Sequence, residues 1–67
     1  MNSKLNELFN LTGRNDFEFT YKTEGEDNFI TLDIDAKLIN VNIANPEDEN
    51  LDAMIGDTIN TLKKTFN

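Results

Sequence analysis

The start of the chain carries apolar residues at helical spacing. They recur at three- and four-residue steps and share one stripe: Leu5, Leu8 and Phe9. This spacing predicts a helix over residues 3–12, because such steps return to the same face of a helix. Asn2 or Ser3 can accept hydrogen bonds from its first free amides, and Gly13 suits the left-handed position that ends a helix. A helix of this length must dock its stripe on other elements to be stable.

Three segments of strict alternation follow, and each predicts a strand with one apolar side. Their apolar sides are, in chain order, Phe17, Phe19 and Tyr21; Ile30, Leu32 and Ile34; and Ile39, Val41 and Ile43. The polar stretch Glu24-Gly25-Glu26-Asp27 separates the first two strands, and Ala36-Lys37 separates the last two. Because Ala36-Lys37 is a poor two-residue hairpin turn, the second connection is either this tight turn or a longer loop.

Antiparallel pairing in chain order brings the apolar sides together. In the first hairpin Phe19 faces Leu32, and in the second hairpin Leu32 faces Val41. The predicted fold class is therefore α+β, with the order α-β-β-β-α and a three-stranded antiparallel meander. Both helices are expected on the apolar face of this sheet. Residues 1–67 form a single small domain, near the lower size limit for a core without staples.

A second amphipathic helix is predicted at the end of the chain. Its stripe consists of Leu51, Met54, Ile55, Ile59, Leu62 and Phe66. Asn45 is a good N-cap and Pro46 fits the first helical position, while an alternative start has Asn50 as the N-cap and leaves residues 46–49 as a loop. Gly56 costs about 1 kcal/mol inside a helix. Close approach of a neighbour would explain it, and so would a tolerated weakness.

Composition narrows the chemistry of this domain. The chain has no cysteine and no histidine, so disulfides, thiolate catalysis and the usual zinc sites are excluded. No catalytic, cofactor-binding or metal-binding motif is present, which favours a non-enzymatic protein without a cofactor. The N-terminal residues lack a signal-peptide pattern, and no apolar run is long enough to span a bilayer, so a cytoplasmic location is expected.

Charge is the most distinctive property of the sequence. Thirteen acidic residues against six basic ones give a net charge of -7. Such a field repels nucleic acid and anionic membranes and attracts basic protein surfaces. Excess acid also keeps a small protein soluble, and solubility alone would account for the charge.

Strand pairing gathers part of this charge at one end of the molecule. The expected register sets Asn28 opposite Asn45, so the turn after the first strand lies beside the start of the last helix. Six acids are thereby expected to form a partner-binding surface: Glu24, Glu26, Asp27, Glu47, Asp48 and Glu49. We call this set the acidic end. Helix capping and turn propensity explain the acids locally without requiring a partner.

A second group of acids is expected on the exposed side of the sheet. Asp33 and Asp35 project from the same side of one strand, and Glu18 lies directly opposite Asp33 in the expected register. Opposed like charges are unfavourable, so this group is either a divalent-cation site or a docking point for a partner's cation. The favoured interpretation is a solvated sheet face, because a cation site needs more oxygen ligands and a loop around the ion.

The element order and length resemble those of the double-stranded RNA-binding domain. In that family the loop between the first two strands and the start of the last helix grip RNA. The matching positions here hold Glu24, Glu26 and Asp27 in the loop and Glu47, Asp48 and Glu49 at the helix start. The sign of the charge is reversed, so direct RNA binding through this surface is not expected.

Size, charge and element order are also similar to those of small acidic phage-encoded inhibitors, including type II-A anti-CRISPR proteins. The resemblance implies a nucleic-acid mimic, encoded by a phage or mobile element, that binds and inhibits a basic nucleic-acid-binding protein. The alternative is a self-associating structural or accessory protein. It would form a homodimer through a sheet edge or a helix face, since both outer strands of a three-stranded sheet are edges.

Overall fold

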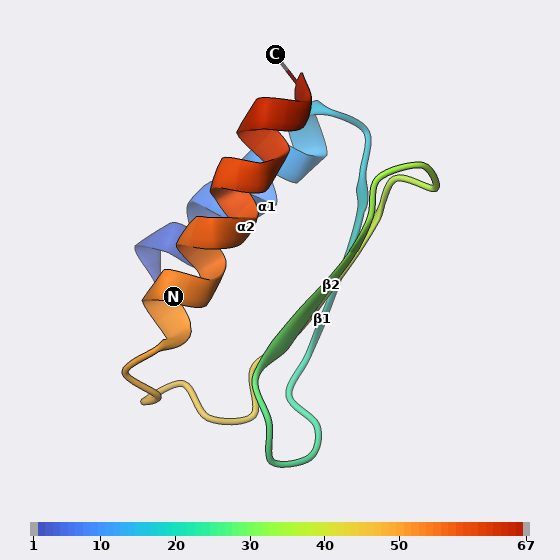
Figure 1. Cartoon of the computed structure of the whole chain (residues 1–67). Coiled ribbons are helices and arrows are strands. Elements are labelled where there is room, and N and C mark those ends of the chain that lie inside the picture. Colours follow the sequence, from blue (N-terminus) through green and yellow to red (C-terminus); the bar gives the residue numbers. More distant parts are fainter. Residues whose placement is uncertain (1, 67) are drawn as a thin grey trace.

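The fold is a layer of two helices packed on one face of a three-stranded sheet (Figure 1). The computed structural model describes residues 2–66. The elements, in chain order, are α1 (Ser3–Arg14), β1 (Glu18–Lys22), β2 (Phe29–Asp33), β3 (Leu38–Asn42) and α2 (Leu51–Phe66). This arrangement confirms the α+β class, the element order and the position of both helices.

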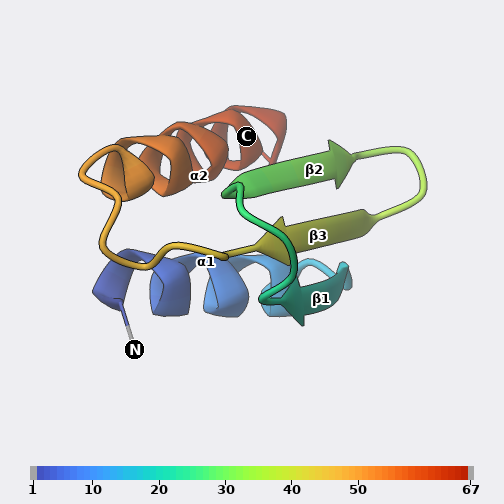
Figure 2. The same cartoon turned by 90° about the horizontal axis from the view of Figure 1, so that it is seen from below.

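The strand order differs from the predicted meander. The order is β1-β3-β2, with β3 in the middle (Figure 2). Strand β3 pairs with β1 in parallel and with β2 antiparallel, so the predicted hairpin between β1 and β2 is wrong. The connection over residues 23–28 passes across the end of β3 instead of turning back on β1. All three strands bear similar apolar sides, so the alternation alone does not determine which two are neighbours.

The hairpin between β2 and β3 is present, but its register is two residues from the predicted one. Leu32 pairs with Ile39, and Asp33 pairs with Leu38, because the loop spans four residues and not two. The Asp33 carboxylate accepts a hydrogen bond from the Ala36 amide at 3.0 Å, which shapes this loop. A shift of two keeps every side chain on its predicted face. The longer connection considered for this turn is therefore confirmed.

Helix α1 begins as predicted and ends later. The Asn2 side chain caps it by accepting hydrogen bonds from the amides of Lys4 and Leu5. Gly13 lies inside the helix, so its predicted role at the helix end is wrong. Asp16 adopts the left-handed conformation there, with φ 63°. Two hydrogen bonds close the end in a Schellman pattern, from the amide of Phe17 to Thr12 O and from that of Asp16 to Gly13 O.

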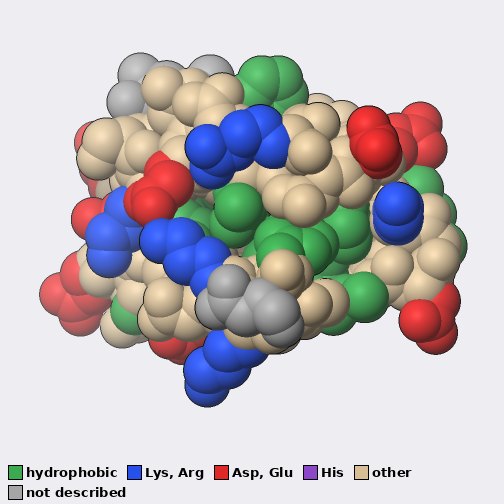
Figure 3. Space-filling model, turned by 90° about the horizontal axis from the view of Figure 1, so that it is seen from above, with side chains coloured by type: hydrophobic (Ala, Val, Ile, Leu, Met, Phe, Trp, Pro, Cys, Tyr) green, Lys and Arg blue, Asp and Glu red, His purple; other side chains and the backbone are tan. Residues whose placement is uncertain are grey.

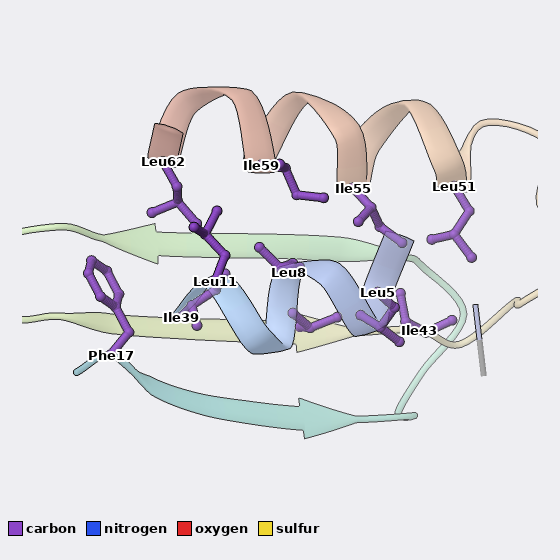
Figure 4. Packing of buried hydrophobic residues seen from close by; sticks show 11 residues of the cluster. Leu5, Leu8, Leu11, Phe17, Ile39, Ile43, Leu51, Ile55, Ile59 and Leu62 are labelled. Carbon is purple, nitrogen blue, oxygen red and sulfur yellow. The ribbon is translucent and has the colours of Figure 1, made fainter. Parts of the chain in front are cut away.

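The core lies between the two helices and the sheet (Figure 4). Its members are Leu5, Leu8, Leu11, Phe17, Ile39, Val41, Ile43, Leu51, Ile55, Ile59 and Leu62. Phe9 is 52% exposed, so its predicted place on the buried stripe is wrong. Leu11 takes that place, because a step of three from Leu8 stays on the face that meets α2 and the sheet.

Helix α2 starts at Leu51, which confirms the alternative start and corrects the one at Asn45. The carbonyl oxygen of Asn50 accepts the first helical hydrogen bond, from the amide of Met54. Asp52 lies in the first turn and accepts a hydrogen bond from the Asn2 side chain at 2.6 Å, which joins the starts of both helices. Residues 46–49 therefore form a loop that leads into the helix.

Gly56 lies where the side chain of Lys4 crosses α2. A Cβ atom at position 56 would lie 3.4 Å from Lys4 Nζ and close to nothing else. The end of a lysine side chain moves easily, so Gly56→Ala should raise the free energy of unfolding by about 0.5–1 kcal/mol through helix propensity. Urea unfolding followed by circular dichroism measures this change. A loss of stability would show that the approach of α1 to α2 requires glycine.

Candidate binding surface at the acidic end

Two loops lie at the same end of the molecule, below the sheet and helices in Figure 1. One is the crossover loop, residues 23–28, and the other joins β3 to α2. Asn28 fastens them with two hydrogen bonds to the backbone of Asn45. Its Nδ2 donates to Asn45 O at 2.6 Å, and its Oδ1 accepts from Asn45 N at 2.8 Å. The loops that carry the predicted acidic end are therefore directly joined.

Asn42 holds the crossover loop over the end of β3. Its side chain is 3% exposed and makes three hydrogen bonds to that loop. Nδ2 donates to the carbonyl oxygens of Glu24 and Asp27, both at 2.8 Å, and Oδ1 accepts from the Glu24 amide at 3.0 Å. Buried polar groups need such partners. One buried amide thus fixes the backbone of two residues in the predicted binding surface.

The second loop is shaped by its own side chains. Asn45 Oδ1 accepts from the Glu47 amide at 3.1 Å, and Asp48 Oδ1 accepts from the Asn50 amide at 2.9 Å. These are turn-forming bonds of asparagine and aspartate. Asp48 is half-buried and its carboxylate serves the turn, whereas Glu47 and Glu49 are exposed. Glu24, Glu26 and Asp27 of the crossover loop are also exposed, so five of the six acids are freely accessible.

Basic side chains lie mostly at the other end. Arg14 is in the last turn of α1, and Lys63 and Lys64 are in the last turn of α2. The space-filling view from above shows lysine and arginine side chains gathered on that side (Figure 3). Among residues 2–66 one salt bridge occurs, between Lys63 Nζ and Glu7 Oε1 at 3.4 Å, and it involves none of the six acids. Within this part of the chain, none of the six acids is held in a salt bridge.

The structure separates the second predicted acidic group. Glu18 and Asp33 do not face each other, because β3 lies between their strands and Leu38 pairs with both. Asp35 lies in the loop after β2 and not on the strand. Among the residues the structure describes, no group of three acids is arranged to hold a metal ion. The predicted cation site required the carboxylates of Glu18 and Asp33 to face each other, and they do not.

Sequence reasoning placed Asn28 opposite Asn45, but it missed the side-chain hydrogen bonds that join them and the role of Asn42. Asn28, Asn42 and Asn45 match no motif, and the chain is rich in asparagine throughout. The position of Asn42 could have indicated its role, because it is the last residue of β3. A polar side chain there can bond to the backbone of a loop that crosses the end of the strand. Only the true strand order shows that a loop passes there.

Comparisons with protein-family models, curated proteins and solved structures found no match for this chain. Between residues 2 and 66, neither helix is long and apolar enough to cross a bilayer.

Proposed function

We propose that this chain is a small non-enzymatic binding protein that engages a basic, nucleic-acid-binding protein through the acidic end. The observation that carries the proposal is the fastening of the two acidic loops by Asn28 and Asn45. Loops needed only for solubility require no fixed relative position. A fixed pair of acidic loops presents carboxylates in a constant arrangement, which lowers the entropic cost of binding.

Electrostatics supports the same partner class. The exposed acids of the two loops have no salt-bridge partner within residues 2–66, so cations from another protein can pair with them. A net charge of -7 steers a basic partner toward the chain and raises the association rate by about 10- to 1,000-fold at low salt. A surface that binds phosphates is rich in lysine and arginine, so carboxylates on this end would compete with nucleic acid for it.

Charge reversal tests the proposal without disturbing the fold. Glu47→Lys with Glu49→Lys changes the net charge by +4, from -7 to -3, at exposed positions in one loop. The matched control is Asp35→Lys with Asp57→Lys, which gives the same net charge at exposed positions outside the acidic end. Asp48 is left intact because its carboxylate caps the turn.

The measurement is affinity capture from a bacterial lysate at low salt and then at high salt. We expect the unmodified chain and the control variant to retain one basic nucleic-acid-binding protein at low salt and to lose it at high salt. The variant reversed at positions 47 and 49 should lose the protein at both salt concentrations. Added nucleic acid should release the captured protein. Equal retention by both variants would overturn the proposal.

A further inference from the structure

The outer edge of β1 is an unpaired strand edge. In the parallel ladder with β3, Glu18 N donates to Lys37 O at 2.8 Å, and Lys22 O accepts from Ile43 N at 3.0 Å. Backbone groups of alternate residues point to opposite edges of a strand. The amides and carbonyls of Phe19 and Tyr21 therefore point away from β3, toward the open edge.

The helix side of this edge is apolar and hollowed. A hollow of about 400 Å³ lies between α1 and β1, lined by Leu5, Asn6, Phe9, Phe19 and Tyr21. Phe9 is 52% exposed and Tyr21 is 49% exposed, and the Phe9 ring meets the Phe19 ring edge-on with centroids 5.2 Å apart. Half-exposed aromatic side chains beside open backbone groups favour an added strand whose side chains enter the hollow.

Two copies of β1 placed antiparallel have complementary side chains. The strand reads Glu18-Phe19-Thr20-Tyr21-Lys22. We propose that a second copy of this chain pairs its β1 antiparallel with this edge, about a two-fold axis at Thr20. Glu18 then faces Lys22 of the second copy, and Phe19 faces its Tyr21. Opposite-charge pairs and aromatic pairs are both favourable across antiparallel strands.

The hydrogen-bonding pattern agrees with this register. Antiparallel strands alternate between pairs that exchange two hydrogen bonds and closer pairs that exchange none. With the axis at Thr20, the bonded pairs are those of Phe19 with Tyr21, whose backbone groups point outward. The pairs of Glu18 with Lys22 are the closer kind, which brings their charges together. Two β1 strands would thus join the sheets of both copies into one.

The other edge of the sheet lacks this property. Strand β2 reads Phe29-Ile30-Thr31-Leu32-Asp33, so the same operation would set Asp33 against Phe29.

In the β1 pairing, the strands run in opposite directions, so the acidic ends of the two copies point apart. Repulsion between them is thereby limited, and both remain accessible to a partner. The pairing stands on β1 alone and does not depend on what binds the acidic end.

Cysteine cross-linking tests the pairing directly, because the chain has no cysteine of its own. Residues at the two-fold axis form a closer pair with Cα atoms about 4.5 Å apart, which suits a disulfide. Thr20→Cys should therefore form a covalent dimer under air oxidation. Thr31→Cys is the matched control, since Thr20 and Thr31 flank the same residue, Asn40, from opposite edges. Intact-mass measurement follows the amount of covalent dimer over time. If Thr20→Cys forms this dimer no faster than Thr31→Cys, the proposal is overturned.

A charge exchange tests the register. Glu18→Lys and Lys22→Glu should each weaken the dimer by about tenfold in sedimentation equilibrium, because each places like charges opposite one another twice per dimer. The double variant restores opposite charges and should recover the original dissociation constant within about threefold. Both positions are exposed, so the fold should be unaffected. A double variant as weak as the single ones would contradict this register.

Discussion

Replacing Asn42 with alanine should lower the free energy of unfolding by about 2–4 kcal/mol. The change removes three hydrogen bonds and leaves an amide and two carbonyls of the crossover loop without their partner. Each such group costs about 1–3 kcal/mol if it stays buried, and part of this cost is recovered when the loop opens to water. For a domain of this size the loss is a large fraction of the total stability.

Asn40→Ala is the matched control for this prediction. Asn40 lies on the same side of β3, two residues earlier, and is exposed. Its substitution should change stability by less than about 0.5 kcal/mol. Urea unfolding gives both values, and hydrogen exchange at the Glu24 amide reports the loop itself. Equal stabilities for the two variants would show that Asn42 does not hold the crossover loop.

Leu8→Ala should lower the free energy of unfolding by about 2–5 kcal/mol. Leu8 is 0% exposed and lies where both helices meet the sheet (Figure 4). Truncation leaves a cavity that the surrounding helices and strands close only in part, so the transfer and cavity terms add. Thermal unfolding followed by circular dichroism will show this as a lower melting temperature.

Phe9→Ala provides the comparison within the same helix. Phe9 is 52% exposed, and its ring contacts the Phe19 ring edge-on. Its loss should cost about 0.5–1.5 kcal/mol. The sequence alone assigned both side chains to one buried stripe and would predict similar costs. A cost for Phe9→Ala equal to that for Leu8→Ala would favour that stripe over the observed one.

The elements were predictable because their patterns are local. Helical spacing and strand alternation follow from backbone geometry, and the predicted helices and strands are all present. The strand order was not predictable from the alternation. Phe19 can pack beside Leu32, as in the predicted meander, or beside Ile39, as observed, and only the path of residues 23–28 across β3 decides between the two arrangements. That path depends on Asn42, whose role appears once β3 is central.

The two loops that carry the six acids were predicted to lie together, and they do so despite the wrong strand order. In both arrangements β2 runs opposite to the other two strands. The last residues of β1 and β3 and the first residues of β2 therefore lie at the same end of the sheet. The two acidic loops therefore come together whichever strand is in the middle. The second acidic group, Glu18 with Asp33 and Asp35, was predicted on the assumption that β1 and β2 are neighbours. Because β3 lies between these strands, that prediction is wrong.

The open edge of β1 was expected from the sequence, but the apolar hollow beside it was not. In the predicted meander the first strand also had a free edge, but its aromatic side chains were assigned to the core. The observed exposure of Phe9 and Tyr21 comes from the position of α1, which leaves a hollow beside the strand. Side-chain exposure on an edge strand depends on tertiary packing, which alternation along the sequence does not encode.

The most direct test of the binding surface is an NMR titration of the ¹⁵N-labelled chain with the partner recovered by capture. We predict the largest amide shift changes at residues 24–28 and 44–49, the two loops joined by Asn28 and Asn45. The turn between β2 and β3, residues 34–37, should stay unchanged. Shift changes centred on that turn, or on the hollow between α1 and β1, with the acidic loops unaffected, would contradict the account.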